Sequence, residues 1–130
     1  MKKQVKIAIS IVAFAVVVAG AYLANYLNSV QTYKNAVDEI SYVHKDVKNI
    51  SDGSYIGECD VQFIYAKVKV TVKNHVITDI ELLEHRHERG AAAESILKEI
   101  VARQEIDVDI VAGATNSSKV IKKAVDNALN

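Results

Sequence analysis

The stretch Lys67-Val-Lys-Val-Thr-Val-Lys73, followed by Asn74-His75, decides the fold. Valine at every second position alternates with lysine or threonine, and this period of two is typical of a strand with one buried and one solvated face. Asn74 tolerates a left-handed backbone, so Asn74-His75 is predicted to form a tight hairpin turn before a strand over 76–83. With a short strand at 55–58 and the hairpin's first strand beginning at 61, the sequence predicts an antiparallel sheet.

Two amphipathic helices are predicted after this hairpin, over residues 91–103 and 116–129. In both segments, apolar residues recur at intervals of three and four positions, and charged residues lie on the opposite face. The predicted fold class is therefore α+β: an N-terminal transmembrane helix followed by a small antiparallel sheet packed with two amphipathic helices. The expected buried positions are Ala92, Ala93, Ile96, Leu97, Ile100, Val101, Val120, Ile121, Ala124, Val125 and Ala128.

The N-terminal segment is predicted to cross a membrane. Only Ser10 and Gly20 interrupt the apolar run from Ile7 to Ala24, which as a helix would span about 27 Å. Three lysines precede this run and no acidic residue occurs before Asp38. The positive-inside rule then places the N-terminus in the cytoplasm, and the C-terminal domain on the extracytoplasmic side of a single-pass cell-membrane anchor.

A cleaved signal peptide is the alternative interpretation of this segment. The small residues Ala19-Gly20-Ala21 are of the kind that a signal peptidase accepts. Both interpretations export the domain.

Three regions are expected along the chain. Residues 1–27 form the transmembrane anchor. Residues 28–50 form a helical stalk or linker, because apolar residues recur in this range at intervals of three and four positions. The dense turn signal Ser51-Asp52-Gly53-Ser54 marks the start of a domain over 51–130.

Charge and cysteine content exclude several classes of function. Beyond residue 28 the chain carries 13 basic and 16 acidic residues, whereas a nucleic-acid partner requires a basic surface. Cys59 is the only cysteine, which excludes an intramolecular disulfide and a thiolate metal cluster. No nucleic-acid partner is expected.

The loop before the last predicted helix combines small residues with hydroxyls. Ala112-Gly113-Ala114 is followed by Thr115, and Ser117 and Ser118 come directly after. Small residues let a ligand approach the backbone, and a helix start offers N–H groups and a positive dipole end, which together suit a phosphate. The alternative is a plain helix N-cap, for which Thr115, Asn116 or Ser117 would serve.

Asp109-Ile-Val-Ala-Gly-Ala-Thr-Asn-Ser-Ser118 resembles the flavin-attachment motif of the FMN-binding domain family, written Asp-x-x-Ser-Gly-Ala-Thr followed by Ser or Thr. Asp52-Gly-Ser-Tyr-Ile-Gly57 is similar to the family's opening turn and strand, and residues 68–85 resemble its central hairpin. The stretch from Gly90 to Asp109 resembles its helix and the approach to the loop. The resemblance therefore covers residues 51–130.

The resemblance implies an extracytoplasmic electron-transfer protein with FMN as its cofactor, like the flavin-bearing subunits of sodium-pumping NADH:quinone reductase and Rnf-type complexes. In those proteins a flavin transferase joins the FMN phosphate to a threonine, and Thr115 is the matching position. Ala112 stands where the family usually has serine, which removes one hydroxyl near the phosphate. The expected partners are the membrane, a flavin transferase and redox proteins. The expected cofactor-binding residues are Asp109, Ala112, Gly113, Ala114, Thr115, Asn116, Ser117 and Ser118.

His85 and His87 have two further interpretations. They could form a metal pair joined by Glu84 or Glu88, but no third ligand of matching spacing is evident, and a solvated strand end is favoured. No metal is therefore expected. The resemblance implies that this region borders the flavin, so either histidine could contact it.

The sequence does not indicate an enzyme that acts without partner proteins. No nucleophile, base and orienting group can be assembled around His44, His75, His85 and His87. An electron carrier is favoured, and a flavin-free sensory or interaction module on a membrane tether remains the alternative.

Overall fold

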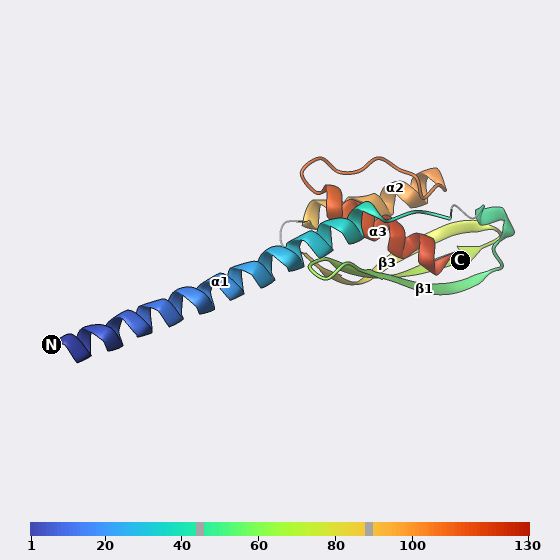
Figure 1. Cartoon of the computed structure of the whole chain (residues 1–130). Coiled ribbons are helices and arrows are strands. Elements are labelled where there is room, and N and C mark those ends of the chain that lie inside the picture. Colours follow the sequence, from blue (N-terminus) through green and yellow to red (C-terminus); the bar gives the residue numbers. More distant parts are fainter. Residues whose placement is uncertain (44–45, 88–89) are drawn as a thin grey trace. The chain divides into compact units, whose positions relative to one another are not determined.

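The computed structural model describes residues 1–43, 46–87 and 90–130 of the chain (Figure 1). These residues divide into two units, Met1–Asn35 and Ala36–Asn130, which are described separately. His44 and Glu88, which entered the sequence interpretation, lie outside the described residues.

Helix α1 (Lys2–Asp38) contains the N-terminal apolar run. It is long and apolar enough to cross a membrane, a property that a signal sequence near an N-terminus shares. The helical structure predicted for residues 28–50 continues only to Asp38. Beyond it, the described residues up to β1 contain one short 3-10 helix, η1 (Val47–Asn49), which begins where the Asp46 carboxylate accepts the N–H of Lys48 at 3.0 Å.

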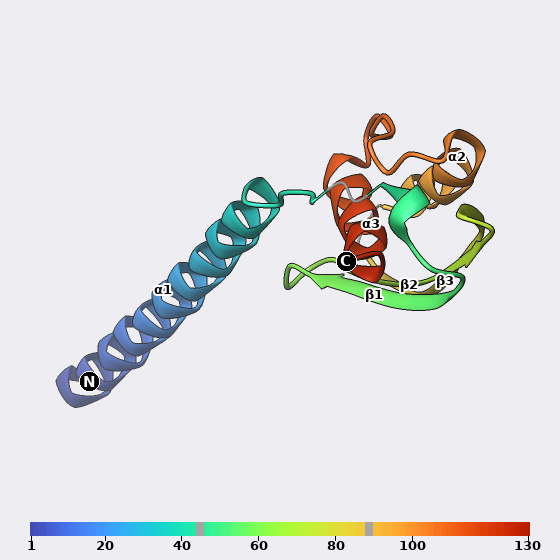
Figure 2. The same cartoon turned by 90° about the vertical axis from the view of Figure 1, so that its right-hand side faces the viewer.

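The sheet is an antiparallel meander in the order β1-β2-β3. The strands are β1 (Gly53–Asp60), β2 (Tyr65–Lys73) and β3 (Val76–Arg86), and Figure 2 shows them as the layer below the helices. The alternation predicted for β2 is confirmed, since its buried positions are Ala66, Val68, Val70 and Val72. Both residues of the predicted hairpin turn have positive φ, 53° at Asn74 and 61° at His75.

The strand boundaries differ from the prediction in all three strands: β1 is longer than the predicted 55–58 at both ends, β3 continues beyond residue 83 to Arg86, and β2 begins later. The strand expected to begin at residue 61 begins at Tyr65. The reason is a tight turn in which Gln62 has a φ of 79° and the Val61 N–H donates to the Ile64 carbonyl at 2.9 Å. Val61 and Ile64 are buried, so their apolar character reflects packing under this turn rather than a strand.

The helices of the domain pack on one face of the sheet. Helix α3 (Thr115–Ala128) covers β1 and β2, and α2 (Ile96–Arg103) lies against β3 (Figures 1 and 2). The predicted helix over 91–103 divides into two parts, because residues Ala91–Ser95 form the 3-10 helix η2, in which the Ala93 N–H donates to the Gly90 carbonyl. The fold class is α+β, as predicted.

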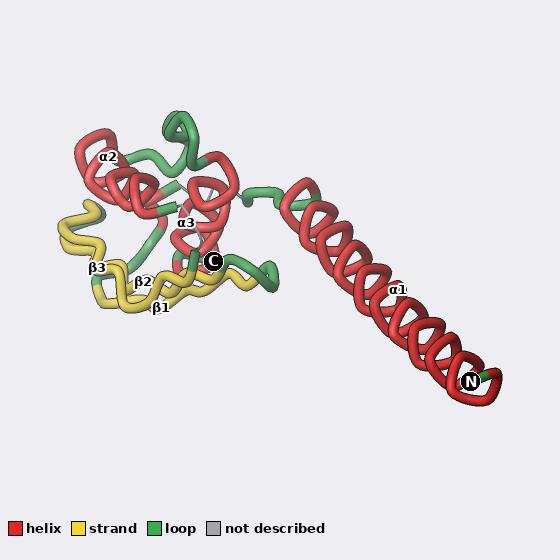
Figure 3. The backbone as a smooth tube through the Cα atoms, turned by 90° about the vertical axis from the view of Figure 1, so that its left-hand side faces the viewer, coloured by secondary structure: helices red, strands yellow, loops and turns green. Residues whose placement is uncertain are grey.

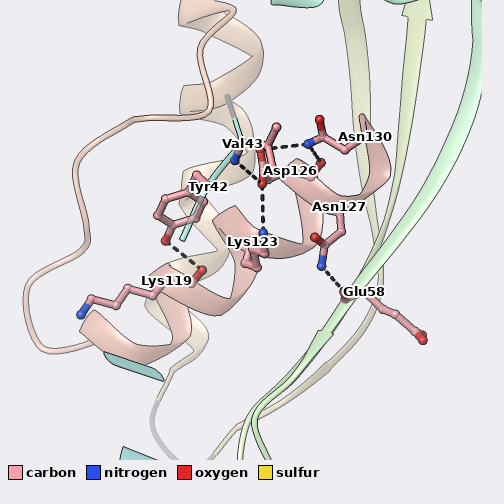
Figure 4. Close-up of polar contacts among 8 residues, drawn as sticks. All are labelled: Tyr42, Val43, Glu58, Lys119, Lys123, Asp126, Asn127 and Asn130. Carbon is pink, nitrogen blue, oxygen red and sulfur yellow. Dashed lines mark hydrogen bonds and ion pairs between the residues drawn. The ribbon is translucent and has the colours of Figure 1, made fainter. Parts of the chain in front are cut away.

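A buried carboxylate joins the segment after α1 to α3 (Figure 4). Asp126 is fully buried, and its Oδ2 accepts the Val43 N–H at 2.9 Å and the Lys123 ammonium at 3.2 Å. Asn130 donates to Oδ1 at 3.2 Å. Because burying an unpaired carboxylate is costly, these partners fix the path of residues 41–43 along α3. This tertiary contact replaces the helical hydrogen bond that the Val43 N–H would otherwise make.

Candidate functional site

The loop between α2 and α3 begins at Gln104, which ends α2 in a left-handed conformation with a φ of 58°. Its side-chain amide pairs with the backbone of Ile77 in β3, accepting the N–H at 2.7 Å and donating to the carbonyl at 2.8 Å. The loop then runs on the side of the helices that faces away from the sheet (green in Figure 3). Gln104 therefore anchors one end of the loop to the sheet.

The middle of the loop is held by a buried lysine of α3. The Lys122 side chain is 7% exposed, and its ammonium donates to the Val108 carbonyl at 2.9 Å and to Asp107 at 3.1 Å. The same ammonium lies 5.1 Å from the centre of the Tyr42 ring. Burial, with further contributions from nearby acidic groups, raises the pKa of Tyr42 to about 12, so the phenol stays neutral.

The last turn of the loop is fixed by Ser118, which is fully buried. Its Oγ accepts the Val111 N–H at 3.0 Å and donates to the Ala114 carbonyl at 2.7 Å. Ala112 and Gly113, which lie between Val111 and Ala114, are exposed. Gly113 has a φ of +80°, and a Cβ built on it would have no atom within 4 Å. The turn is therefore held at its base by two hydrogen bonds and open on its outer side.

Helix α3 begins directly after this turn, at Thr115. Ala114 occupies the N-cap position and makes no side-chain capping hydrogen bond. The interpretation of Thr115, Asn116 or Ser117 as the N-cap was therefore wrong, because all three lie inside the helix. A helix start of this kind, without a capping side chain, presents backbone N–H groups and a positive dipole end to an anion.

The three hydroxyls of the motif differ in accessibility. Thr115 is exposed, whereas Ser117 and Ser118 are 2% and 0% exposed. Ser117 packs against Gly90, where an added Cβ would overlap the Ser117 Oγ. Among these three residues, only Thr115 offers a hydroxyl to a ligand or an enzyme outside the domain.

The remaining residues predicted for this site lie in the same loop and helix start. Asp109 is exposed, six positions before Thr115, and Asn116 is half-buried beside it. Ala114 is buried beneath the turn. The structure therefore presents Asp109, Ala112, Gly113 and Thr115 on the surface and uses Ala114, Ser117 and Ser118 as internal support.

His85 and His87 lie at the end of β3 and just beyond it, as the interpretation of a strand end requires, but the side chain of His85 is not solvated. The His85 side chain is 2% exposed, and its Nδ1 lies 2.9 Å from Oε1 of Glu94. The rings of His85 and His87 are tilted by 37° to each other, with 4.3 Å between their centres. The acidic partner comes from η2, not from Glu84, and sequence spacing could not reveal it.

This histidine cluster borders the start of α3. The Gly90 N–H donates to Nδ1 of His87 at 2.9 Å, and Gly90 in turn packs against Ser117. Gly90 therefore adjoins both His87 and the first turn of the helix that begins at Thr115.

Comparison with known families adds the decisive observation. The sequence profile of the FMN-binding domain matches residues 64–130, just over half of the chain. The chain belongs to the FMN-binding domain family. Its cofactor is FMN. The match extends through β2, β3, α2 and α3 and includes both the exposed turn and the histidine cluster. A search of curated proteins finds no match.

The residues of the loop fit a flavin phosphate. The exposed side of Gly113 leaves room at the backbone, and the helix start lies beside the exposed hydroxyl of Thr115. Ala112 lacks the hydroxyl that the family usually places there, but its small side chain keeps the turn accessible. These features are compatible with a flavin phosphate at this turn.

Proposed function

We propose that this chain is a membrane-anchored electron carrier whose FMN is attached through its phosphate to Thr115. The observation that carries this proposal is the position of the Thr115 hydroxyl, exposed at the start of α3 while Ser117 and Ser118 are buried. When bound, FMN supplies the electron transfer, and the protein supplies position and electrostatics.

In the proposed attachment step, a flavin transferase uses FAD as the donor. The Thr115 oxygen bonds to the phosphorus of the FMN half, the bond between the two phosphates breaks, and AMP leaves. The hydroxyl proton passes to a base of the transferase. The phosphodiester formed keeps one negative charge, which the helix N-terminus stabilises.

The exposure of the turn supports a carrier rather than a self-sufficient enzyme. Ala112, Gly113 and Thr115 lie on the surface of the domain, so a flavin held there is open to redox partner proteins. The burial of His85 favours a place within the histidine cluster over contact with a flavin on this exposed turn.

The first prediction concerns flavin attachment. When the full chain is co-expressed with a flavin transferase, its intact mass is expected to rise by one FMN less one water, and without the transferase it should not rise. A yellow protein of unchanged mass would mean that FMN is bound noncovalently. A colourless protein of unchanged mass, made with an active transferase, would favour the flavin-free interaction module.

The second prediction concerns topology. We propose that α1 is retained as an anchor, with the N-terminus in the cytoplasm and the domain outside, because its three lysines precede the apolar run. Protease added to spheroplasts should digest the chain beyond about residue 50 and leave an N-terminal tag intact. A protected domain with an accessible tag would contradict this orientation, and a shortened chain released from the membrane would indicate signal cleavage.

A further inference from the structure

We propose that His85, His87 and Glu94 form a binding site for a divalent metal ion of the zinc type. One ligand atom from each of these side chains lies within 4.8 Å of those from the other two. Two elements of the fold create this arrangement, since β3 leads to both histidines and η2 supplies the carboxylate. The site is distinct from the hydroxyl of Thr115.

The strongest support comes from the outer nitrogen of His85. Its Nε2 is buried and has no hydrogen-bond partner in the part of the chain that the structure describes. Because Nδ1 faces the Glu94 carboxylate at 2.9 Å, the neutral ring carries its proton on Nδ1 and its lone pair on Nε2. A buried lone pair without a partner is unfavourable, and a metal ion would satisfy it.

Glu94 then has the role that carboxylates commonly have beside metal-bound histidines. It holds the ring of His85 in one tautomer and orientation, and its negative charge offsets that of the cation. Its side chain is 44% exposed, so it also leaves a route by which an ion can reach the cluster.

His87 supplies the second imidazole. Its Nδ1 accepts the Gly90 N–H at 2.9 Å, so in the metal-free state the lone pair of the neutral ring is on Nδ1. Metal binding therefore requires one local change, in which the ion replaces this N–H at Nδ1. The change breaks the hydrogen bond from the Gly90 N–H to His87.

The donor set indicates the class of metal. Imidazole nitrogen suits zinc and its first-row neighbours, whereas calcium and magnesium prefer oxygen ligands throughout. The group contains no cysteine, so its donors are nitrogen and oxygen atoms. With the two imidazoles as direct ligands and Glu94 bonded to Nδ1 of His85, the remaining coordination positions are left to water.

The third prediction tests this site by metal titration. The full chain, purified in detergent from a host without flavin transferase and stripped with a chelator, should bind Zn²⁺ at a ratio of one ion per chain by calorimetry. Co²⁺ should give a visible absorption band from nitrogen and oxygen coordination. We expect His87→Gln to abolish saturable binding and Glu94→Gln to weaken it by about 10- to 100-fold.

His75→Gln is the matched control. His75 contacts the Ile50 carbonyl through Nδ1 at 3.1 Å and lies in the hairpin turn, so its loss should leave zinc affinity unchanged. Because His85 is buried and His85→Gln could unfold the domain, the variants at His87 and Glu94 carry the test, with their folding checked by circular dichroism.

Three outcomes would overturn the metal site: no saturable binding in the wild type, full binding in His87→Gln, or equal loss in His75→Gln. Zinc binding should also persist in Thr115→Ala. Failure of flavin attachment and failure of the metal site are therefore separable.

Discussion

Thr115→Ala is expected to abolish covalent flavin attachment completely when the flavin transferase is co-expressed. The substitution removes the only exposed hydroxyl among the three of the motif and keeps the small turn before α3 intact. Ala also has the higher helix propensity at this helical position, so the fold should not suffer. Flavin fluorescence in the gel after denaturing electrophoresis measures the effect: wild type should fluoresce and Thr115→Ala should be dark.

Two variants distinguish attachment from a general disturbance of the loop. Thr115→Ser keeps a hydroxyl at the same position and should retain part of the fluorescence. Ser117→Ala removes a hydroxyl that is 2% exposed and should leave the site of attachment unchanged. If Thr115→Ala fluoresces as strongly as wild type, the bond lies elsewhere. If wild type is dark but the native protein is yellow, FMN is held noncovalently, and the lost hydroxyl at Ala112 becomes the first explanation to test.

The sheet could be predicted from the sequence because two local signals, the alternation of apolar residues and the residues of the hairpin turn, indicate the same structure. The alternating valines of β2 and the left-handed residues Asn74 and His75 depend only on local backbone preferences. The start of β2 could not be predicted in this way, because Val61 and Ile64 are buried by a turn. Apolar character reports burial and does not by itself specify a strand.

The end of α1 depended on contacts that are distant in sequence. The spacing of apolar residues predicted a helix through residue 50, but the chain leaves the helix after Asp38. The Val43 N–H then donates to Asp126, 83 positions away. A local pattern contains no information about such a partner, so tertiary structure overrides helix propensity here.

The sequence predicted which residues make up the candidate site but not which of them are exposed. The motif placed Thr115, Ser117 and Ser118 together, yet their exposure follows from where α3 begins and which side faces Gly90. The acidic member of the histidine cluster was missed for a similar reason. Glu94 reaches His85 because residues 91–95 form a 3-10 helix, whereas the sequence favoured an α-helix over the whole segment.

Gly57→Ala is expected to destabilise the domain more than any surface substitution, because α3 lies directly on this residue of β1. A Cβ at Gly57 would overlap the carbonyl oxygen of Ala124 and the amide nitrogen of Ala128, and would lie 2.7 Å from the Cα of Ala128. All three are backbone atoms, so no side-chain rotation can relieve the overlap. The helix must move away from the sheet, which would open the core. We expect a loss of about 3 kcal/mol or more in the free energy of unfolding.

Ile56→Ala is the matched control for this effect. Ile56 is the neighbouring residue of β1 and is 60% exposed, so its truncation creates no cavity and should change stability little. Thermal unfolding of the detergent-solubilised chain, followed by circular dichroism, should show a midpoint lower by more than about 10 °C for Gly57→Ala. Equal midpoints for Gly57→Ala and wild type would contradict the close packing of α3 on β1. Since α3 also positions Thr115, Gly57→Ala should lose flavin attachment together with stability, whereas Thr115→Ala should lose attachment alone.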